Sequence, residues 1–349
     1  MGNIISNYTK SKIKRISLLL MIAVFVIHAN TVSFLANDSM AQQLQFLIVN
    51  EICRVAVPMF FLISGFLFFY KTQNVFNLNC YLKKIHSRFF SIFLPLMLYW
   101  LINFSTVVIF QLLKGKYIGG SDIDLYQGAI KAASTIYHCW FLRDLLFFTL
   151  MSPLIFLSVF YLKIFSVIVT VMFHIYFPHL VVFDTDGIIW FILGAYLAIY
   201  GFRFVEKKIT SNQILFCGGI WLLLCGLLNW KLFPPSYGAA LVRNACGVIF
   251  VWYGYDWFCQ YHCSPSSKLW SYWDRWSAFT FFIYLFHEPL MSIVRKGILA
   301  FLDVKSISVM WAYVIWFILI LLIFSILILI GNFWKTRHIT SYHLFSGRR

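Results

Sequence analysis

The sequence predicts an all-α protein, a polytopic membrane bundle of about ten transmembrane helices with both termini in the cytoplasm. The first observation is composition: the 349 residues are 61% hydrophobic and 11% charged, whereas soluble domains carry about 25% charged residues. The second is a mean hydropathy of +0.82, with apolar runs of bilayer-spanning length along the whole chain. The third is that runs such as VIWFILILLIFSILILI are apolar on every face, which excludes the alternating strands of an outer-membrane barrel.

Ten apolar segments are candidates for these helices. The first follows several basic residues, as a signal peptide would, but it has a long core and no small-residue cleavage site. The fifth and sixth are separated only by a tight turn at Asp184 to Gly187. The ten predicted spans are 15–35, 53–70, 89–112, 138–160, 164–183, 187–202, 212–230, 238–258, 277–294 and 307–333.

Basic residues set the predicted orientation. The net charge of +16 arises from 28 Lys and Arg against 12 Asp and Glu. With the N-terminus inside, most of the basic residues fall in inner segments, which predicts cytoplasmic termini. Basic loops beside apolar runs meet anionic lipid headgroups, so we expect no nucleic-acid partner. The chain reads as one membrane domain, 1–349, with short cytoplasmic tails at about 1–14 and 334–349.

The eight cysteines are scattered, mostly inside apolar runs, so we expect reduced, buried thiols. Cys259, His262 and Cys263 form the one local group, and they lack the paired spacing of a zinc site. The sequence therefore predicts no metal.

Ionisable residues inside spans are costly unless they face protein or water, so each is a candidate functional residue. His28 lies about 20 Å of helix rise beyond Arg15. Because imidazole titrates near neutrality, His28 is a candidate general base; the alternative is a neutral histidine bonded to a backbone carbonyl. The ninth span carries His287 and Glu288, and Pro289 is expected to break the helix behind them. Glu288 is expected to pair with an arginine from the second or fourth span, in a structural ion pair or a functional site.

The second span begins at its outer end with Arg54, either a site residue or an anchor at the interface. In its middle, Ser64 and Gly65 form a small-residue notch that another helix or a ligand can approach closely.

The fourth span opens with YHCWFLRDLLFF, which places His138, Trp140, Arg143 and Asp144 within two turns. Adjacent residues do not face each other on a helix, so we expect Arg143 or Asp144 to find a partner elsewhere.

A common depth links the candidates of different spans. Under the predicted topology they all lie at mid-depth or in the outer half of the bilayer, which predicts one shared polar site. They are His28, Arg54, Arg143, His287 and Glu288.

The inner face carries a basic cluster before the third span, made of Lys83, Lys84 and Arg88. The cluster is either a positive-inside anchor or a phosphate site.

Five strings occur in a fixed order: VFVIH at 24–28, VPMFFLISGFLFF at 57–69, KKIHSRFFSIFLPL at 83–96, CWFLRDLLFF at 139–148 and FIYLFHEPL at 282–290. In these strings and their order, almost the whole chain resembles the acyltransferase family 3 integral membrane proteins. Those proteins transfer acyl groups, usually acetyl from acetyl-CoA, to sugars of bacterial surface polysaccharides and related glycans. The family's first-helix arginine is replaced by Ser17, which leaves Arg15 or Lys14 as its substitute. By helical geometry Arg15 points away from the His28 face, and Lys14 lies within about 40° of it.

The resemblance implies acetyl-CoA as the acyl-donor cosubstrate and no permanently bound cofactor. His28 would act as general base or acetyl relay, and a nearby arginine would stabilise the oxyanion that forms on the thioester carbonyl. The catalytic set is then His28, Arg54, Arg143 and Glu288. The CoA-binding set is Lys83, Lys84 and Arg88. The acceptor-binding set is Trp140, His138, His287 and Ser64.

The resemblance also implies a multi-pass protein of the bacterial inner membrane, with membrane lipid and a glycan or lipid-linked sugar as partners and with a homo-oligomer left open. The alternative functions are an exporter of a polysaccharide, a lipid-linked glycan or a small acid without acyl transfer, and a sensor or structural membrane protein.

Overall fold

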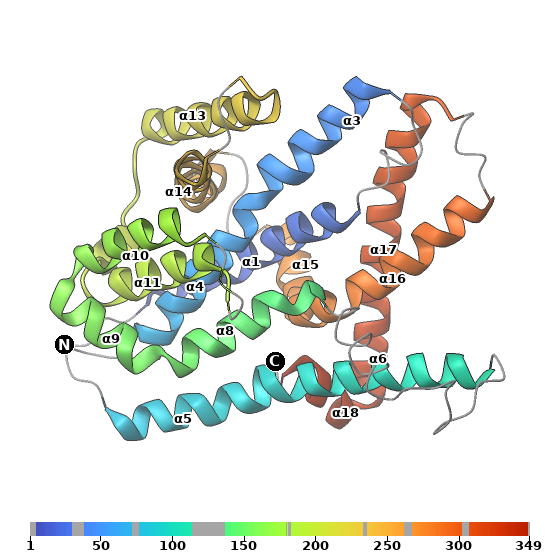
Figure 1. Ribbon diagram of the computed structural model, residues 1–349, viewed down its shortest axis with the longest axis horizontal. Helices are drawn as coiled ribbons and strands as arrows, with labels where there is room; N and C mark the ends of the chain where they lie inside the picture. Colours follow the sequence, from blue (N-terminus) through green and yellow to red (C-terminus); the bar gives the residue numbers. More distant parts are fainter. Residues whose placement is uncertain are drawn as a thin grey trace. The chain divides into compact units, whose positions relative to one another are not determined.

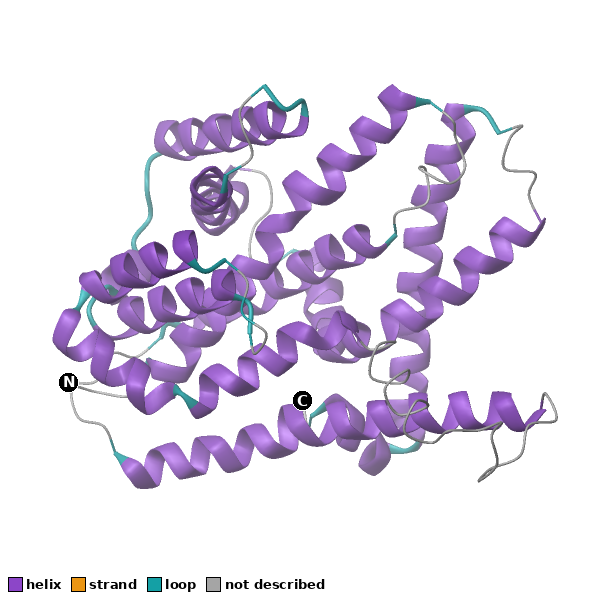
Figure 2. Cartoon of the chain, viewed as in Figure 1, coloured by secondary structure: helices purple, strands orange, loops and turns teal. Residues whose placement is uncertain are grey.

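The computed structural model describes residues 5–29, 38–71, 77–113, 137–178, 180, 183–232, 236–261, 267–301 and 307–347. Within these ranges the regular structure is helical and no strand is formed (Figure 2), which confirms the predicted all-α class. The chain divides into two compact units. The first is Met1–Phe76 with Met151–Ile328, and the second is Asn77–Leu150 with Leu329–Arg349.

The first unit holds most of the helices (Figure 1). They are α1 (Asn7–His28), α3 (Ser39–Phe46), α4 (Ala56–Phe69), α9 (Ser152–Leu162), α10 (Ile164–Tyr176), α11 (Thr185–Ile199), α12 (Phe202–Glu206), α13 (Ser211–Asn229), α14 (Tyr237–Tyr261), α15 (Lys268–Trp276), α16 (Thr280–Phe301) and the first part of α17 (Val309–Arg337). A π-helical turn, Leu47–Ile52, and a 3-10 turn, Cys53–Val55, join α3 to α4.

Helix α1 is central to this unit. Its N-cap is Ser6, whose side chain accepts a hydrogen bond from the backbone N–H of Thr9, as short hydroxyl residues do at helix starts. Several of its apolar residues, such as Leu18 and Phe25, are fully buried, and the helix contacts α4, α14, α15 and α16. The last residue of α1 is His28, so the unit's core positions this side chain.

Helices α4 and α11 pack at backbone contact distance (Figure 1). A Cβ at Gly65 would lie 2.1 Å from the carbonyl oxygen of Phe191, and a Cβ at Gly194 would lie 2.2 Å from that of Leu62. Both glycines are required because any side chain there would collide with backbone. The predicted notch at Ser64 and Gly65 is therefore occupied, at Gly65, by another helix.

The second unit is built on one long helical segment. It consists of α5 (Leu78–Arg88), a π-helical turn (Phe89–Phe93) and α6 (Leu94–Leu113), together with α8 (Trp140–Leu150), the end of α17 and α18 (Ile339–Ser346). Gly347, which ends α18, has φ +68°, and a Cβ on it would lie 2.3 Å from the carbonyl oxygen of Ser91. Only glycine adopts this conformation freely. The predicted C-terminal tail thus contains a helix that packs on α6.

Four helical segments of the described chain are long and apolar enough to cross a membrane. They are Ser39–Phe69, Leu78–Leu113, Ser211–Asn229 and Val309–Arg337, and the broken pair α8 and α9 would add a fifth. These segments support a membrane protein, while the ten-span topology and the cytoplasmic termini stay predictions.

The helices extend beyond the predicted elements at three places. The helices that contain the second and third predicted spans begin earlier than those spans, at Ser39 and at Leu78, where polar residues hide the helical pattern. The expected break at Pro289 is wrong, since α16 continues through it to Phe301. Buried helices tolerate proline when neighbouring groups satisfy the freed carbonyl.

Candidate functional site

Three of the predicted site residues meet in the first unit. His28 Nδ1 lies 3.3 Å from Glu288 Oε2, and the rings of His28 and His287 are 4.9 Å apart between centroids. The side chains of His287 and Glu288 are buried, and that of His28 is 19% exposed. The end of α1 and the middle of α16 thus place two imidazoles and one carboxylate in a largely apolar environment, with one imidazole accessible.

Neighbouring groups orient two members of this cluster. His287 Nδ1 lies 2.7 Å from the carbonyl oxygen of Tyr284; because a carbonyl only accepts, Nδ1 carries the proton and the neutral ring has its lone pair on Nε2. The ring of Phe25 packs 5.9 Å from that of His287. Ser292 Oγ donates to Glu288 Oε1 at 3.2 Å. The expected arginine partner of Glu288 is replaced in this contact by His28.

The same three side chains could also hold a metal ion. One donor atom from each of His28, His287 and Glu288 can be chosen so that all lie within 4.8 Å of one another, and two imidazoles with a carboxylate are a known zinc ligand set. A proton relay through these groups would need no metal. The sequence predicts no metal site at Cys259, His262 and Cys263. Of these three residues only Cys259 lies in the described chain, where it is buried.

Arg54 does not share a hydrogen bond with this cluster. Its exposed guanidinium donates from Nη2 to Asn50 Oδ1 at 3.2 Å. Ser64 is half-buried on α4, next to the glycine that contacts α11.

A buried ion pair near Arg54 was missed by the sequence analysis. Arg243 Nη1 donates to Glu51 Oε2, and both residues are about nine-tenths buried. Arg243 also donates from Nε and Nη2 to Asn244 Oδ1, at 3.2 and 3.0 Å. The sequence does indicate such a pair, because Arg243 lies inside the eighth predicted span and intramembrane arginines need partners.

The N-terminal half of α1 carries two further ion pairs. Lys12 Nζ lies 2.7 Å from Asp256 Oδ2, with both side chains buried. Arg15 makes a two-pronged contact with Asp274, Nε to Oδ1 at 2.9 Å and Nη2 to Oδ2 at 2.8 Å. Lys14 is exposed, whereas Arg15 is buried and its partner Asp274 is 32% exposed. These pairs fix α1 to α14 and α15.

The premise that two adjacent helix residues cannot pair is wrong for Arg143. Its Nε donates to Asp144 Oδ1 at 2.8 Å, although the residues are adjacent. The side chain of Arg143 is 55% exposed and that of Asp144 is fully buried. A long arginine side chain can curl back to a neighbour whose Cβ points elsewhere, which the spacing rule for helix faces does not consider.

The remaining candidates of the second unit lie in two segments of the chain, α5 and the start of α8 with the 3-10 turn before it. His138 is buried with its ring 5.9 Å from that of Tyr99, and Trp140 is half-buried at the start of α8. The basic cluster lies on α5 and not in a loop. There Lys83 is exposed, and Lys84 and Arg88 are half-buried one turn apart.

Comparison with known proteins gives one match. No curated protein and no solved structure matches the chain. A family described as "Acyltransferase domain", of the acyltransferase 3 type, matches residues 18–331. The matched range includes His28, His287 and Glu288 and begins just after Arg15. Because this range spans nearly the whole sequence, the chain belongs to the acyltransferase 3 family of membrane acyltransferases.

Proposed function

We propose that the protein transfers an acetyl group from acetyl-CoA to a hydroxyl group of a bacterial surface polysaccharide or a lipid-linked glycan. The contact between His28 and Glu288 carries the proposal. A carboxylate beside Nδ1 of an imidazole favours the proton on Nδ1, which leaves the Nε2 lone pair as a base, and it stabilises the imidazolium that forms later. His28 is also the accessible member of the cluster, so an acceptor hydroxyl can reach it.

The reaction then follows from these groups. His28 Nε2 removes the proton of the acceptor hydroxyl as its oxygen attacks the thioester carbonyl. The tetrahedral intermediate collapses, the carbon–sulfur bond breaks, and His28 returns the proton to the CoA sulfur. The products are an acetyl ester and CoA thiol, so atoms and charge balance. His287, whose ring touches that of His28, would contact the acceptor.

The proposal also assigns roles to the other predicted residues, on the basis of their side-chain chemistry. Arg54 or Arg143 would stabilise the oxyanion through its positive charge. Both guanidinium groups are exposed, so a substrate can reach them. The acceptor would also contact Ser64, His138 and Trp140. The CoA phosphates would bind Lys83, Lys84 and Arg88, which present three cations along one helix.

The proposed setting is the inner membrane, with ten spans and cytoplasmic termini. This orientation would bring acetyl-CoA to the basic cluster from the cytoplasm and place His28 at the far end of α1. The donor thioester would therefore have to reach into the bundle.

Transfer of radiolabel from acetyl-CoA into the glycan fraction of membranes tests the function. His28→Ala should lower the rate at least about a hundredfold, the usual contribution of a general base, while the protein still accumulates in the membrane. The matched control is His174→Ala, another buried histidine, bonded to Thr185 through Nδ1. It should retain transfer if it accumulates normally.

Two results would count against the proposal. Retention of more than about a tenth of the activity in His28→Ala would exclude His28 as the base. Absence of labelled glycan with the wild-type protein, while an unmodified glycan or small acid crosses the membrane, would support the alternative exporter.

A further inference from the structure

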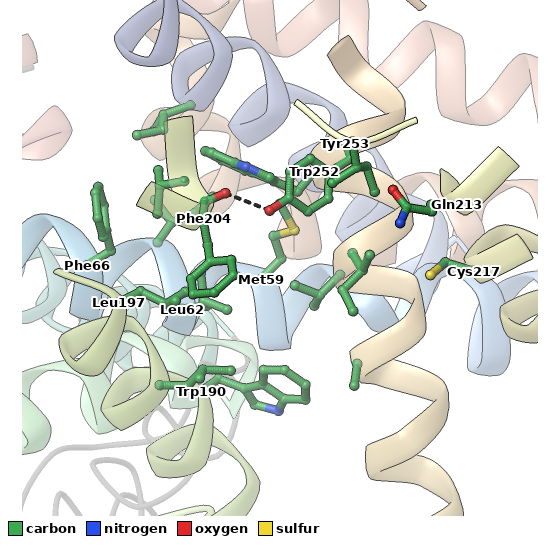
Figure 3. Close-up of a pocket in the computed structure, with 18 of the residues that line it drawn as sticks. Met59, Leu62, Phe66, Trp190, Leu197, Phe204, Gln213, Cys217, Trp252 and Tyr253 are labelled. Atoms are coloured by element: carbon green, nitrogen blue, oxygen red, sulfur yellow. Dashed lines mark hydrogen bonds between the residues drawn. The ribbon is translucent and has the colours of Figure 1, made fainter. Parts of the chain in front are cut away.

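The first unit contains an apolar cavity of about 520 Å³ that is separate from the His28 cluster. Its walls come from α1, α4, α11, α12, α13 and α14. Trp190 and Leu197 of α11 lie opposite Cys217 of α13 and Trp252 of α14 (Figure 3). The volume lies within the range of about 300–1,000 Å³ that small-molecule sites occupy, far more than an acetyl group needs.

The chemistry of the walls selects an apolar occupant. Nearly all of the lining side chains are hydrocarbon or aromatic, and the tyrosine among them, Tyr253, uses its hydroxyl to donate to the carbonyl oxygen of Phe204 at 2.6 Å (Figure 3). The amide of Gln213 accepts the backbone N–H of Thr210. A ligand inside would find hydrophobic surface and few hydrogen-bond partners, which suits an alkyl chain.

Part of the cavity wall is exposed at the surface. Phe204 and Phe216, which line it, are 59% and 68% exposed, and Gln213 beside them is also exposed. In a membrane protein, exposed phenylalanine next to an exposed amide is expected near the interface between lipid chains and headgroups.

The segment around Phe204 is basic. Arg203, Lys207 and Lys208 are exposed in the short segment that also supplies lining residues. The one acidic residue of that segment, Glu206, is directed to the start of α1. Its carboxylate accepts hydrogen bonds from Ser6 N, Ser6 Oγ and Thr9 Oγ1 at 2.9–3.2 Å. This segment therefore carries net positive charge and also supplies Phe204 and Val205 to the apolar cavity.

We propose that this cavity binds one acyl chain of an anionic phospholipid, whose phosphodiester headgroup lies against Arg203 and Lys207. The occupant is a lipid of the surrounding membrane because its chain enters from the side, at Phe204 and Phe216, and its headgroup stays at the level of the cations. Clusters of Lys and Arg beside apolar surface attract anionic headgroups in this way. This lipid site does not depend on the proposed acyl transfer. Trp252 in the cavity wall also contacts Lys12, whose Nζ lies 3.9 Å from the centroid of the indole ring.

Native mass spectrometry of the purified full chain tests the proposal. The protein in mild detergent is mixed with equal amounts of dioleoyl phosphatidylglycerol and dioleoyl phosphatidylcholine, and the bound lipids are counted. The wild type should retain phosphatidylglycerol in preference. The double variant Arg203→Gln/Lys207→Gln should reduce this preference roughly tenfold, because each cation near a headgroup favours an anionic lipid.

Matched variants separate the cavity from the outer surface. Lys268→Gln/Arg275→Gln removes two exposed charges from α15 and should keep the preference. Ala245→Trp on α14 and Leu193→Trp on α11 fill the cavity from two different helices, and each should lower the retention of both lipids. Leu222→Trp, on the exposed face of α13, should leave retention unchanged. Size-exclusion chromatography selects the variants that remain monodisperse.

The proposal is overturned if the two lipids bind equally, if the two charge-removal variants behave alike, or if both monodisperse filled-cavity variants retain lipid as the wild type does. A polyprenyl phosphate that co-purifies, or added palmitoyl-CoA that displaces phosphatidylglycerol, would assign the cavity to a different ligand. Acetyl transfer is measured in the same preparations. Loss of lipid with transfer intact, or the reverse, distinguishes this site from the proposed function.

Discussion

His28 Nδ1 lies 3.3 Å from Glu288 Oε2, a contact that joins the last residue of α1 to the middle of α16. A glutamate at this burial needs a partner that offers a proton or a positive charge. An imidazole can supply the proton when it is neutral and the positive charge when it is protonated. The contact therefore explains why an acidic residue is tolerated in an apolar helix, and it gives His28 a defined orientation.

The contact predicts that His28 and Glu288 act as one unit in catalysis. His28→Ala and Glu288→Gln should each lower the transfer rate strongly, and the double variant should be little slower than the worse single variant. The rates are measured with radiolabelled acetyl-CoA in membranes that contain equal amounts of each variant. Losses that multiply would show that the two residues act independently.

A parallel double-variant comparison examines Arg143. If Arg143 belongs to the same constellation, Arg143→Ala combined with Glu288→Gln should also lose less than the product of the single losses. If the effects multiply, the contact between Arg143 and Asp144 is a local feature of α8.

The basic cluster on α5 is expected to affect donor binding. Lys83→Gln, Lys84→Gln and Arg88→Gln together should raise the KM for acetyl-CoA, because three charges that could meet phosphates are removed, with kcat less affected. Steady-state kinetics with varied acetyl-CoA measures this split, and Lys268→Gln/Arg275→Gln is the control. Reporter fusions that show an inverted loop with unchanged KM would make the cluster an orientation anchor only.

The contact between α4 and α11 is expected to tolerate no side chain at Gly65. Gly65→Ala should reduce the thermal stability of the purified protein, because the methyl group would meet the backbone of Phe191 at 2.1 Å. Backbone cannot rotate away as a flexible side chain could. Thermal unfolding in detergent measures the effect. Gly219→Ala, which has no atom within 4 Å of the new Cβ, should be neutral or slightly stabilising, and equal behaviour of the two variants would contradict the packing.

The pair of Arg15 and Asp274 predicts a pH dependence on the acidic side. Hydrogen bonds from Arg15 hold the pKa of the Asp274 carboxyl below its ordinary value. Since the folded-state pKa is the lower one, the stabilisation is fully present above the unfolded pKa of about 3.9 and is lost as pH falls through the folded value. Because Asp274 is 32% exposed, the effect is reduced by solvent screening.

Thermal midpoints recorded between pH 6 and pH 3 check this prediction. The midpoint of Asp274→Asn should start lower at pH 6 and fall less steeply than that of the wild type. Parallel curves would mean that the pair contributes no pH-dependent stability.

The sequence by itself determined the all-α class, the apolar character, the family strings and the rule that ionisable residues in apolar helices need partners. That rule identified His28, His287 and Glu288, because a single residue such as Glu288 is costly wherever its helix packs. The sequence did not show which residue each of these side chains pairs with. Glu288 pairs with His28 and not with a predicted arginine, Arg243 pairs with Glu51, and Arg143 curls to Asp144.

Tertiary structure decided these pairings because helix rise gives depth along a helix and carries no information about which helices adjoin. Adjacency depends on shape, as where Gly65 and Gly194 let α4 and α11 approach. The cavity beside Trp252 is a further example, since its walls come from six helices and no single segment predicts a void between them. Chemistry that one residue carries can be predicted from sequence, whereas chemistry that arises from a contact requires the fold.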